Sequence, residues 1–457
     1  MTNAPAAADG HGLKRELRDR HVSMISIGGI IGGGLFVGSS VALHAAGPAA
    51  VFSYMLAGLI VVLIMRMLAE MSLAKAGTVS FAEYARAGLG PLGGYLVGWL
   101  YWYFWIMVVP YEAIVGAKIL HAWIPLPDLV IGLGLMGIMT GVNLMSAKSY
   151  AEFEFWFASI KVAAIIAFIV VGLGWVFGVH PATHEVLGTL TGDGGIAPNG
   201  LLPVLAAVPT VFFALTGAEI TAVAAGEARD PVRAMTRMSM SVVARILLFY
   251  IGSLIVIALV VPWRTIEPGH SPFTAALNAM GFGWASTAMN LVILTATLSC
   301  LNSAFYVTSR MAFALAAVGD APKALVKVNA RGVPTRTVWL GAISGAAGVV
   351  AAVISYEGVF EFLQDSSGAV VLFIYTMLAL SQIRLRNRRS EAEQKALPIQ
   401  MWLFPWASWA AVIAMGVVLV AMARTASLAH SFWASALTLV VTAIIWYVHR
   451  GRVPRQG

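Results

Sequence analysis

Apolar runs of about 18 or more residues recur along this chain, and each is long enough to cross a lipid bilayer as a helix. Hydrophobic residues make up 59% of the sequence and charged residues only 11%, which differs strongly from the composition of soluble globular domains. The chain is therefore predicted to be an all-α polytopic membrane protein.

The apolar runs number about twelve, and the basic residues are distributed unevenly between the loops that join them. Lysine and arginine collect at both termini and in alternate loops, whereas the other loops hold little beyond Lys118, Arg264 and Arg424. Because positively charged loops stay in the cytoplasm, both termini are predicted to be cytoplasmic, and the net charge of +8 does not indicate nucleic-acid binding. The predicted spans are 22–44, 48–70, 93–120, 127–146, 153–177, 201–225, 241–262, 286–313, 337–355, 360–382, 403–423 and 430–448.

The sequence carries no signature of an enzyme or of a bound cofactor. It has no Walker loop, no zinc-type His/Glu spacing and no acidic calcium loop. Its single cysteine, Cys300, excludes an internal disulfide framework and a cysteine metal site. We therefore predict that the protein is not an enzyme and holds no metal or cofactor.

The first span contains a dense group of glycines within Ile25–Val41. A glycine costs about 1 kcal/mol relative to alanine in a helix interior, so the group predicts a helix that breaks in the middle of the membrane. A break exposes backbone N–H groups that lipid cannot satisfy, and those at the start of the second half-helix suit a carboxylate. The alternative is close helix packing, because the same glycines match the small-xxx-small pattern. The glycines are Gly28, Gly29, Gly32, Gly33 and Gly34.

Span 6 contains a second interruption, at Gly217 and Glu219. A glycine and a carboxylate are both costly in the middle of a span. Spans 1 and 6 are the first helices of two five-helix halves, and interruptions at corresponding positions are the best sequence indicator of a transporter binding site. The two breaks together favour a substrate site, with Glu219 accepting hydrogen bonds from backbone groups that the break frees.

Other ionisable residues also lie within the spans. Lys161 in span 5 is expected to exchange a proton, with snorkelling towards an interface as the alternative. Glu112 in span 3 is expected to pair with a substrate amine or to relay a proton, with a purely structural pairing as the alternative. Asp365 and Glu361 are expected to cap span 10. Arg66 and Glu70 are expected to form an ion pair on one helix face.

Several motifs are distributed over residues 13–450. They are Ile27–Ser39, Met65–Met71, Ser80–Tyr84, Glu152–Trp156, Gly217–Glu219, Cys300–Ala304, Ser309–Met311 and Gly319–Pro322. As a set they resemble the amino acid transporter family of the amino acid–polyamine–organocation superfamily. Within that family, Val109–Ala113, Leu298–Asn302 and Asp365–Ala369 are most similar to the bacterial 4-aminobutyrate (GABA) permeases.

The resemblance implies a LeuT-like fold, in which spans 1–5 and 6–10 form a 5+5 inverted repeat with broken helices 1 and 6. The implied organisation is a cytoplasmic tail (1–21), a transport core (22–382), a cytoplasmic loop (383–402), peripheral spans 11 and 12 (403–449) and a second cytoplasmic tail (450–457). The implied activity is that of a secondary active transporter of the bacterial inner membrane, which imports 4-aminobutyrate with a proton by alternating access and without sodium. The alternatives are a permease for alanine, glycine, serine or proline and, in another class, an amino-acid sensor or a channel.

The resemblance also implies roles for individual residues. The expected partners are an amino acid substrate, protons and the lipid bilayer, with no nucleic acid. Lys161 would occupy the position of a sodium ion and couple proton movement to transport, and Glu112 would line the pocket. The substrate carboxylate would bind at Ile30, Gly32, Gly33 and Gly34, and Phe213 would cover it as an aromatic lid. The substrate amine would bind at Ala214, Thr216 and Gly217. Cys300 and Asn302 would lie near the transport pathway.

Overall fold

The computed structural model describes residues 31–74, 81–145, 147–179, 188–190, 192, 194–217, 219, 233, 242–329 and 332–450. Within these ranges the regular structure is helical and contains no strand. Eight of the described helical segments are long and apolar enough to cross a membrane, and two further apolar helices are shorter. The segment 33–74 counts once among the eight, although it covers the first two predicted spans.

Every predicted span overlaps a helix in the described part of the chain. The total of twelve membrane crossings and the inverted repeat remain predictions. The helices between residues 33 and 215 are α2 (Gly33–Phe36), α3 (Ser39–Ala46), α4 (Ala50–Ala74), α5 (Phe81–Leu89), α6 (Pro91–His121), α7 (Asp128–Asn143), α8 (Ala147–Gly174), α10 (Leu201–Ala206) and α11 (Val208–Leu215). The helices between residues 246 and 450 are the π-helix η3 (Ile246–Gly252), α14 (Ser253–Val260), α15 (Pro272–Ala279), α16 (Gly283–Ala317), α17 (Thr335–Ala351), α18 (Tyr356–Asn387), α19 (Glu391–Lys395), α20 (Trp406–Arg424) and α21 (Ala426–Arg450).

The break predicted in span 1 is present. Gly32 has an extended backbone (φ −128°, ψ −155°) and precedes α2, which is only four residues long. A turn at Val37 and Gly38 separates α2 from α3, so the span is not a continuous helix. Gly28, Gly29 and Ile30 lie outside the described residues.

The break predicted in span 6 is also present. Helix α11 ends at Leu215, and Thr216 adopts an extended conformation (φ −68°, ψ 150°). Gly217 follows with a φ of +112°, a left-handed conformation that only glycine adopts without strain. This glycine is therefore required by the backbone path of the break.

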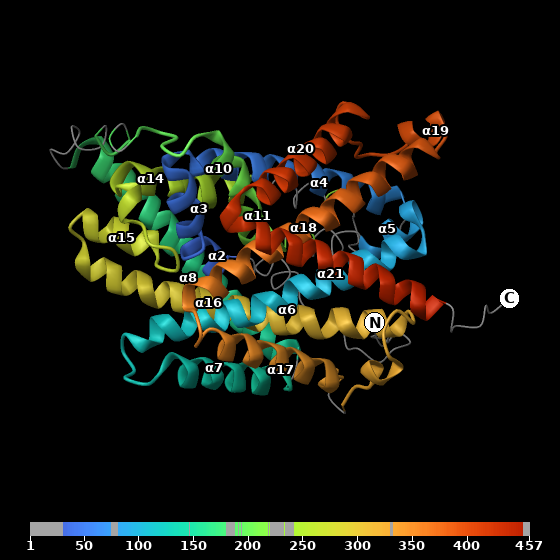
Figure 1. The fold of residues 1–457 in the computed structure, drawn as a ribbon, viewed down its shortest axis with the longest axis horizontal. Coiled ribbons are helices and arrows are strands. Elements are labelled where there is room, and N and C mark those ends of the chain that lie inside the picture. The colour runs from blue at the N-terminus through green and yellow to red at the C-terminus, as the bar shows by residue number, and fades with distance from the viewer. Residues whose placement is uncertain are drawn as a thin grey trace, which may run out of the picture.

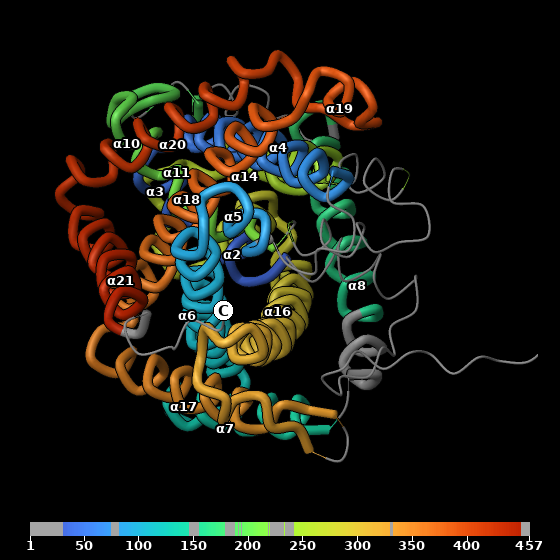
Figure 2. The backbone as a smooth tube through the Cα atoms, turned by 90° about the vertical axis from the view of Figure 1, so that its right-hand side faces the viewer, coloured from blue at the N-terminus to red at the C-terminus, as the bar shows by residue number. Residues whose placement is uncertain are grey.

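Three long helices form the centre of the molecule. Figure 1 shows α6, α16 and α18 running along its length, and α6 packs against both of the others. Helices α7 and α17 pack together on one side, and α4 and α20 lie on the opposite side (Figure 1). Seen end-on, the short helix α2 lies at the centre of the bundle, whereas α8 and α21 lie at opposite edges (Figure 2). The contacts of α2 with α6, α11 and α16 place the first break against three helices.

The outer helices expose large apolar side chains. A soluble protein rarely exposes contiguous apolar surface of this extent, so these faces suit contact with lipid. The exposed side chains include Ile166, Val170 and Val171 on α8, Ile413, Val417 and Val420 on α20, and Trp433, Leu437 and Ile444 on α21.

Two expectations about polar residues near the ends of spans are wrong. Ser355, not Asp365 or Glu361, caps α18, because its hydroxyl accepts the N–H of Gly358. Asp365 lies further along the helix and accepts a hydrogen bond of 2.5 Å from the hydroxyl of Thr210. The hydrogen-bond donor comes from α11, and the position of Asp365 in the sequence does not show that α11 lies beside it.

Arg66 and Glu70 do not form the expected pair. Arg66 donates instead to the carbonyl of Gln400 (2.8 Å), and the carboxylate of Glu70 accepts from Arg386 on α18 (2.9 Å). Glu70 also accepts the N–H of Met401. The two side chains therefore connect α4 to α18 and to the segment before α20.

Candidate functional site

A small cavity lies where α2, α6, α11 and α16 meet. Its volume of about 20 Å³ is enough for about one water molecule, so the site must widen to accept an amino acid. The residues that line it are Gly34, Phe104, Trp105, Val108, Glu112, Phe213, Ala214, Thr216 and Cys300.

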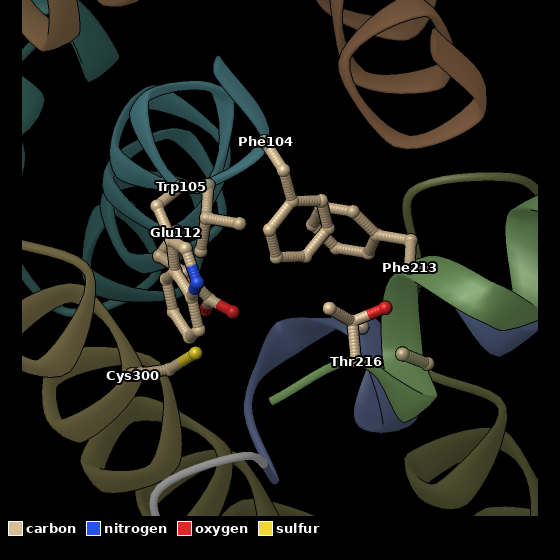
Figure 3. Close-up of a pocket in the computed structure, with 9 residues that line it drawn as sticks. Phe104, Trp105, Glu112, Phe213, Thr216 and Cys300 are labelled. Atoms are coloured by element: carbon tan, nitrogen blue, oxygen red, sulfur yellow. The ribbon is translucent and has the colours of Figure 1, made fainter. Parts of the chain in front are cut away.

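Helix α6 contributes one continuous face to the cavity. Trp105, Val108 and Glu112 are spaced by three and four residues, and this spacing places side chains on the same side of a helix. Figure 3 shows Trp105 and Glu112 projecting from α6 towards Cys300, with Phe213 and Thr216 across the open space. Glu112 is only 1% exposed, and it is the one acidic residue among those lining the cavity.

The carboxylate of Glu112 binds the backbone of the first break. The N–H of Gly33 donates to both carboxylate oxygens, each at 3.0 Å. A Cβ atom at Gly32 would lie 2.4 Å from Oε1 of Glu112 and 2.6 Å from the Cβ of Cys300. The close approach of α2 to α6 and α16 therefore requires a glycine at position 32.

Lys161 binds the same segment from α8. Its side chain is fully buried, and Nζ donates to the carbonyl of Ile31 (2.8 Å) and to the hydroxyl of Ser299 (2.9 Å). A buried cation thus pairs with a carbonyl of the break, and the buried anion Glu112 pairs with an N–H two residues later. Backbone groups that a continuous helix would pair internally are paired here by two charged side chains.

The second break contributes the end of α11. The ring of Phe213 packs edge-on against Tyr111, with 4.4 Å between centroids, and at a tilt against Phe104, with 6.0 Å between centroids. The carbonyl of Ala214 accepts a hydrogen bond from Tyr250 (2.8 Å) and retains a second lone pair. The hydroxyl of Thr216 donates to the carbonyl of Phe212, 2.6 Å away.

Aromatic side chains cover the cavity towards the end of the bundle where α18 begins. Tyr111 stacks on Phe360 with 4.8 Å between ring centroids, and Phe360 stacks on Tyr356 with 5.9 Å between ring centroids.

Towards the other end of α18, the carboxylate of Glu219 accepts hydrogen bonds from the N–H of Gly217 and from the hydroxyl of Tyr375, each at 3.0 Å. Access from either end therefore requires movement of these groups.

The structure brings most of the expected site residues together. Gly34, Glu112, Phe213, Ala214, Thr216 and Cys300 line the cavity. Gly32, Gly33 and Lys161 lie directly behind that lining through their contacts with Glu112 and with Ile31. Beside the cavity, the carboxylate of Glu219 accepts a hydrogen bond from the N–H of Gly217.

One of the expected site residues lies away from the cavity. The side chain of Asn302 pairs with that of Asn143 (2.8 Å) and does not line the cavity. Ile30 lies outside the described residues. The sequence analysis missed Phe104, Trp105 and Val108, although counting back one and two helical turns from Glu112 would have found the last two.

Comparison with known proteins places the chain in a family. The family model described as amino acid permease matches residues 21–454. The gamma-aminobutyric acid permease of Bacillus subtilis is 43% identical over 436 residues, which cover 95% of this chain and 92% of that protein. The probable GABA permease of Pseudomonas aeruginosa is 42% identical over 96% of this chain and 94% of its own length. The gamma-aminobutyric acid permease of Escherichia coli is 43% identical over 90% of this chain and 89% of its own length. With its two broken helices and its buried charged residues, this chain therefore belongs to the amino acid permease family of the amino acid–polyamine–organocation superfamily.

Proposed function

We propose that this protein is a secondary active transporter that imports 4-aminobutyrate together with a proton by alternating access. The observation that carries the proposal is the pair of buried charges, Lys161 and Glu112, bound to one broken segment in the membrane. Intramembrane charges are costly and usually serve transport. The names of the three relatives support the substrate, because all three refer to GABA.

Glu112 provides the partner for the substrate ammonium. A buried cation needs an opposite charge, and Glu112 is the acidic residue that lines the cavity. Carbonyl oxygens at the end of α11 are further candidate acceptors, and that of Ala214 already accepts one hydrogen bond, from Tyr250. The resemblance assigns the substrate carboxylate to Gly32–Gly34, and this assignment requires Glu112 to release the N–H of Gly33.

Lys161 provides the coupling to protons. A charged ammonium binds the carbonyl of Ile31 more strongly than a neutral amine does, because charge-assisted hydrogen bonds are the stronger kind. Loss of its proton therefore loosens the segment that leads into α2. Because Gly33 of the same segment binds Glu112, a change at Lys161 is transmitted to the substrate site.

The test is uptake of labelled 4-aminobutyrate into proteoliposomes in sodium-free buffer, with and without an inward proton gradient. We expect accumulation that a protonophore abolishes. Lys161→Ala is expected to exchange substrate across the membrane but to lose gradient-driven accumulation, because the proton no longer controls the segment. Lys395→Ala is the matched control, since that lysine is exposed on α19.

Three results would contradict parts of this proposal. Accumulation by Lys161→Ala at the wild-type level would remove the coupling role of the lysine. Uptake that requires sodium would remove proton symport. Transport of alanine, glycine, serine or proline without transport of 4-aminobutyrate would keep the permease activity and discard the substrate.

A further inference from the structure

Asp365 is a buried carboxyl group that has no part in the proposed substrate site. It is 3% exposed, and because α18 begins at Tyr356 it lies roughly 14 Å along the helix, near the middle of a bilayer core about 30 Å thick. Its single hydrogen-bond partner in the described structure is the hydroxyl of Thr210 on α11, which donates at 2.5 Å. An ionised carboxylate has about four acceptor sites, so one hydroxyl leaves most of them unused.

No cation balances Asp365 in the described part of the chain. None of the ion pairs there includes it. The charged group that acts on it is Glu361, one turn earlier on α18, and this second acid repels a negative charge on Asp365. His44 on α3 and His430 on α21 act on Glu361 instead. Helix α11, which supplies Thr210, carries no ionisable side chain.

The other helices packed against α18 direct their charged groups elsewhere. Helix α6 presents two tyrosines to the residues beside Asp365, and the arginines of α20 and α21 stand at the last residue of each helix. The two tyrosines are Tyr103, next to Ser366, and Tyr111, next to Gln364. Charged groups of α4, α5 and α6 with partners elsewhere are Arg66 (Gln400), Glu70 (Arg386), Arg86 (Asp320), Glu112 (Gly33) and Lys118 (Asp128).

The contact between α11 and α18 suits a protonated carboxyl group. An uncompensated charge in an apolar interior costs so much that a buried carboxyl group takes up a proton instead. The protonated group still accepts the hydroxyl of Thr210 through one oxygen. There is little space for water around an anion, because the helices approach so closely at Gly368 and Pro209 that a Cβ on the glycine would overlap the proline carbonyl.

The position of Asp365 connects this contact to the substrate cavity. Thr210 lies one helical turn before Phe213, which lines the cavity. Next to Asp365, Gln364 donates to the carbonyls of Thr210 (3.3 Å) and Gly38 (3.1 Å), so the same turn of α18 also holds the first broken span. Separation of α11 from α18 would therefore move Phe213 and release the segment between α2 and α3.

We propose that Asp365 is a proton-binding site separate from Lys161, and that α11 closes on α18 only when this carboxyl group carries a proton. The proton comes from water while the helices are apart, which forms the O–H bond, and it returns to water when they separate again. This inference rests on the proposed function and adds to it a group that makes closure of the cavity more favourable as the pH falls.

The test measures exchange of labelled for unlabelled 4-aminobutyrate in proteoliposomes with the same pH on both sides. Asp365→Asn keeps the size of the side chain and an acceptor for Thr210, but it cannot ionise. The ratio of the Asp365→Asn rate to the wild-type rate removes the contribution of Lys161, which both proteins contain. We expect a ratio near one at about pH 5 that rises at least tenfold by about pH 9, because the protonated fraction of a carboxyl group falls up to about tenfold per pH unit.

Glu361→Gln is the matched control, because it makes the same chemical change one turn earlier on α18. It removes a negative charge beside Asp365, so ionisation of Asp365 becomes easier. The ratio of this variant to the wild type is therefore expected to stay level or to fall as the pH rises.

Thermal unfolding in detergent is a second measurement that needs no transport. A carboxyl group that is protonated in the fold and ionised in the unfolded chain lowers stability as the pH rises. The midpoints of the wild type and of Asp365→Asn should therefore agree at about pH 5, and that of Asp365→Asn should be the higher one at about pH 8.

The outcomes separate this inference from the function on which it rests. A level ratio for Asp365→Asn would make Asp365 a structural hydrogen-bond acceptor and would overturn the inference. Loss of exchange or of folded protein at every pH would overturn it too, because a neutral side chain should permit closure. If the wild type transports another amino acid instead, the proposed substrate fails, and the pH dependence of the two midpoints still decides the inference.

Discussion

At Gly32 the absence of a side chain allows Glu112 to reach the backbone of the first break. We predict that Gly32→Ala lowers the affinity for substrate at least tenfold and the free energy of unfolding by about 1–3 kcal/mol. The added Cβ would lie 2.4 Å from Oε1 of Glu112, and it would also lie 2.6 Å from the Cβ of Cys300, which cannot rotate away. Binding assays and thermal unfolding in detergent measure the two effects. Gly134→Ala on α7 is the control, because nothing lies within 4 Å of its added Cβ. Wild-type affinity in Gly32→Ala would show that the contact between Glu112 and Gly33 is dispensable.

Helices α11 and α18 approach each other so closely that their backbones are in contact. Thr210 on α11 donates to Asp365, and Gln364 donates to the carbonyl of Thr210 at 3.3 Å. Gln364 also donates to the carbonyl of Gly38 (3.1 Å), so α18 holds both broken spans at once. A Cβ atom at Gly368 would lie 1.8 Å from the carbonyl oxygen of Pro209.

We predict that Gly368→Ala separates α18 from α11 and lowers both the thermal midpoint and the transport rate. A backbone carbonyl cannot rotate out of the way, so the helices must move apart, and overpacking of this kind costs about 1–3 kcal/mol or more. Gly416→Ala on α20 is the control, because its Cβ would meet no atom within 4 Å. An unchanged midpoint in Gly368→Ala would mean that the two helices are not in fixed contact.

The distribution of basic residues over the whole molecule predicts its orientation in the membrane. Arg384, Arg386, Arg388 and Arg389 follow one another at the end of α18, whereas the short loop between α6 and α7 (residues 122–127) contains no lysine or arginine. Because positively charged segments stay in the cytoplasm, the end of α18 is expected inside the cell and the loop 122–127 outside.

Reporter fusions in bacteria test this orientation. A fluorescent protein fused after residue 457 should fluoresce, and alkaline phosphatase fused there should be inactive. Alkaline phosphatase inserted between residues 123 and 124 should be active. The reverse pattern would contradict the predicted cytoplasmic termini.

The sequence by itself determined the class of the protein and the places where its spans break. Long apolar runs with few charges have few stable arrangements other than membrane helices, and this property is local to each run. Glycine preference is local too, so the breaks at Gly32 and Gly217 could be predicted from composition. Lys161 and Glu112 were predicted to lie within spans, but the sequence left snorkelling open for Lys161, and the structure shows both side chains buried.

Only the tertiary structure decided which groups these residues bind. These contacts depend on which helices meet and on how each helix is rotated about its axis. Examples are Glu112 with the N–H of Gly33, Tyr250 with the carbonyl of Ala214, and Asn302 with Asn143. Hydropathy and helical periodicity describe one helix at a time and carry no information about its neighbours. For the same reason Trp105 looked like one of several aromatic residues of span 3, and its place in the cavity emerged only when α6 was packed against α2, α11 and α16.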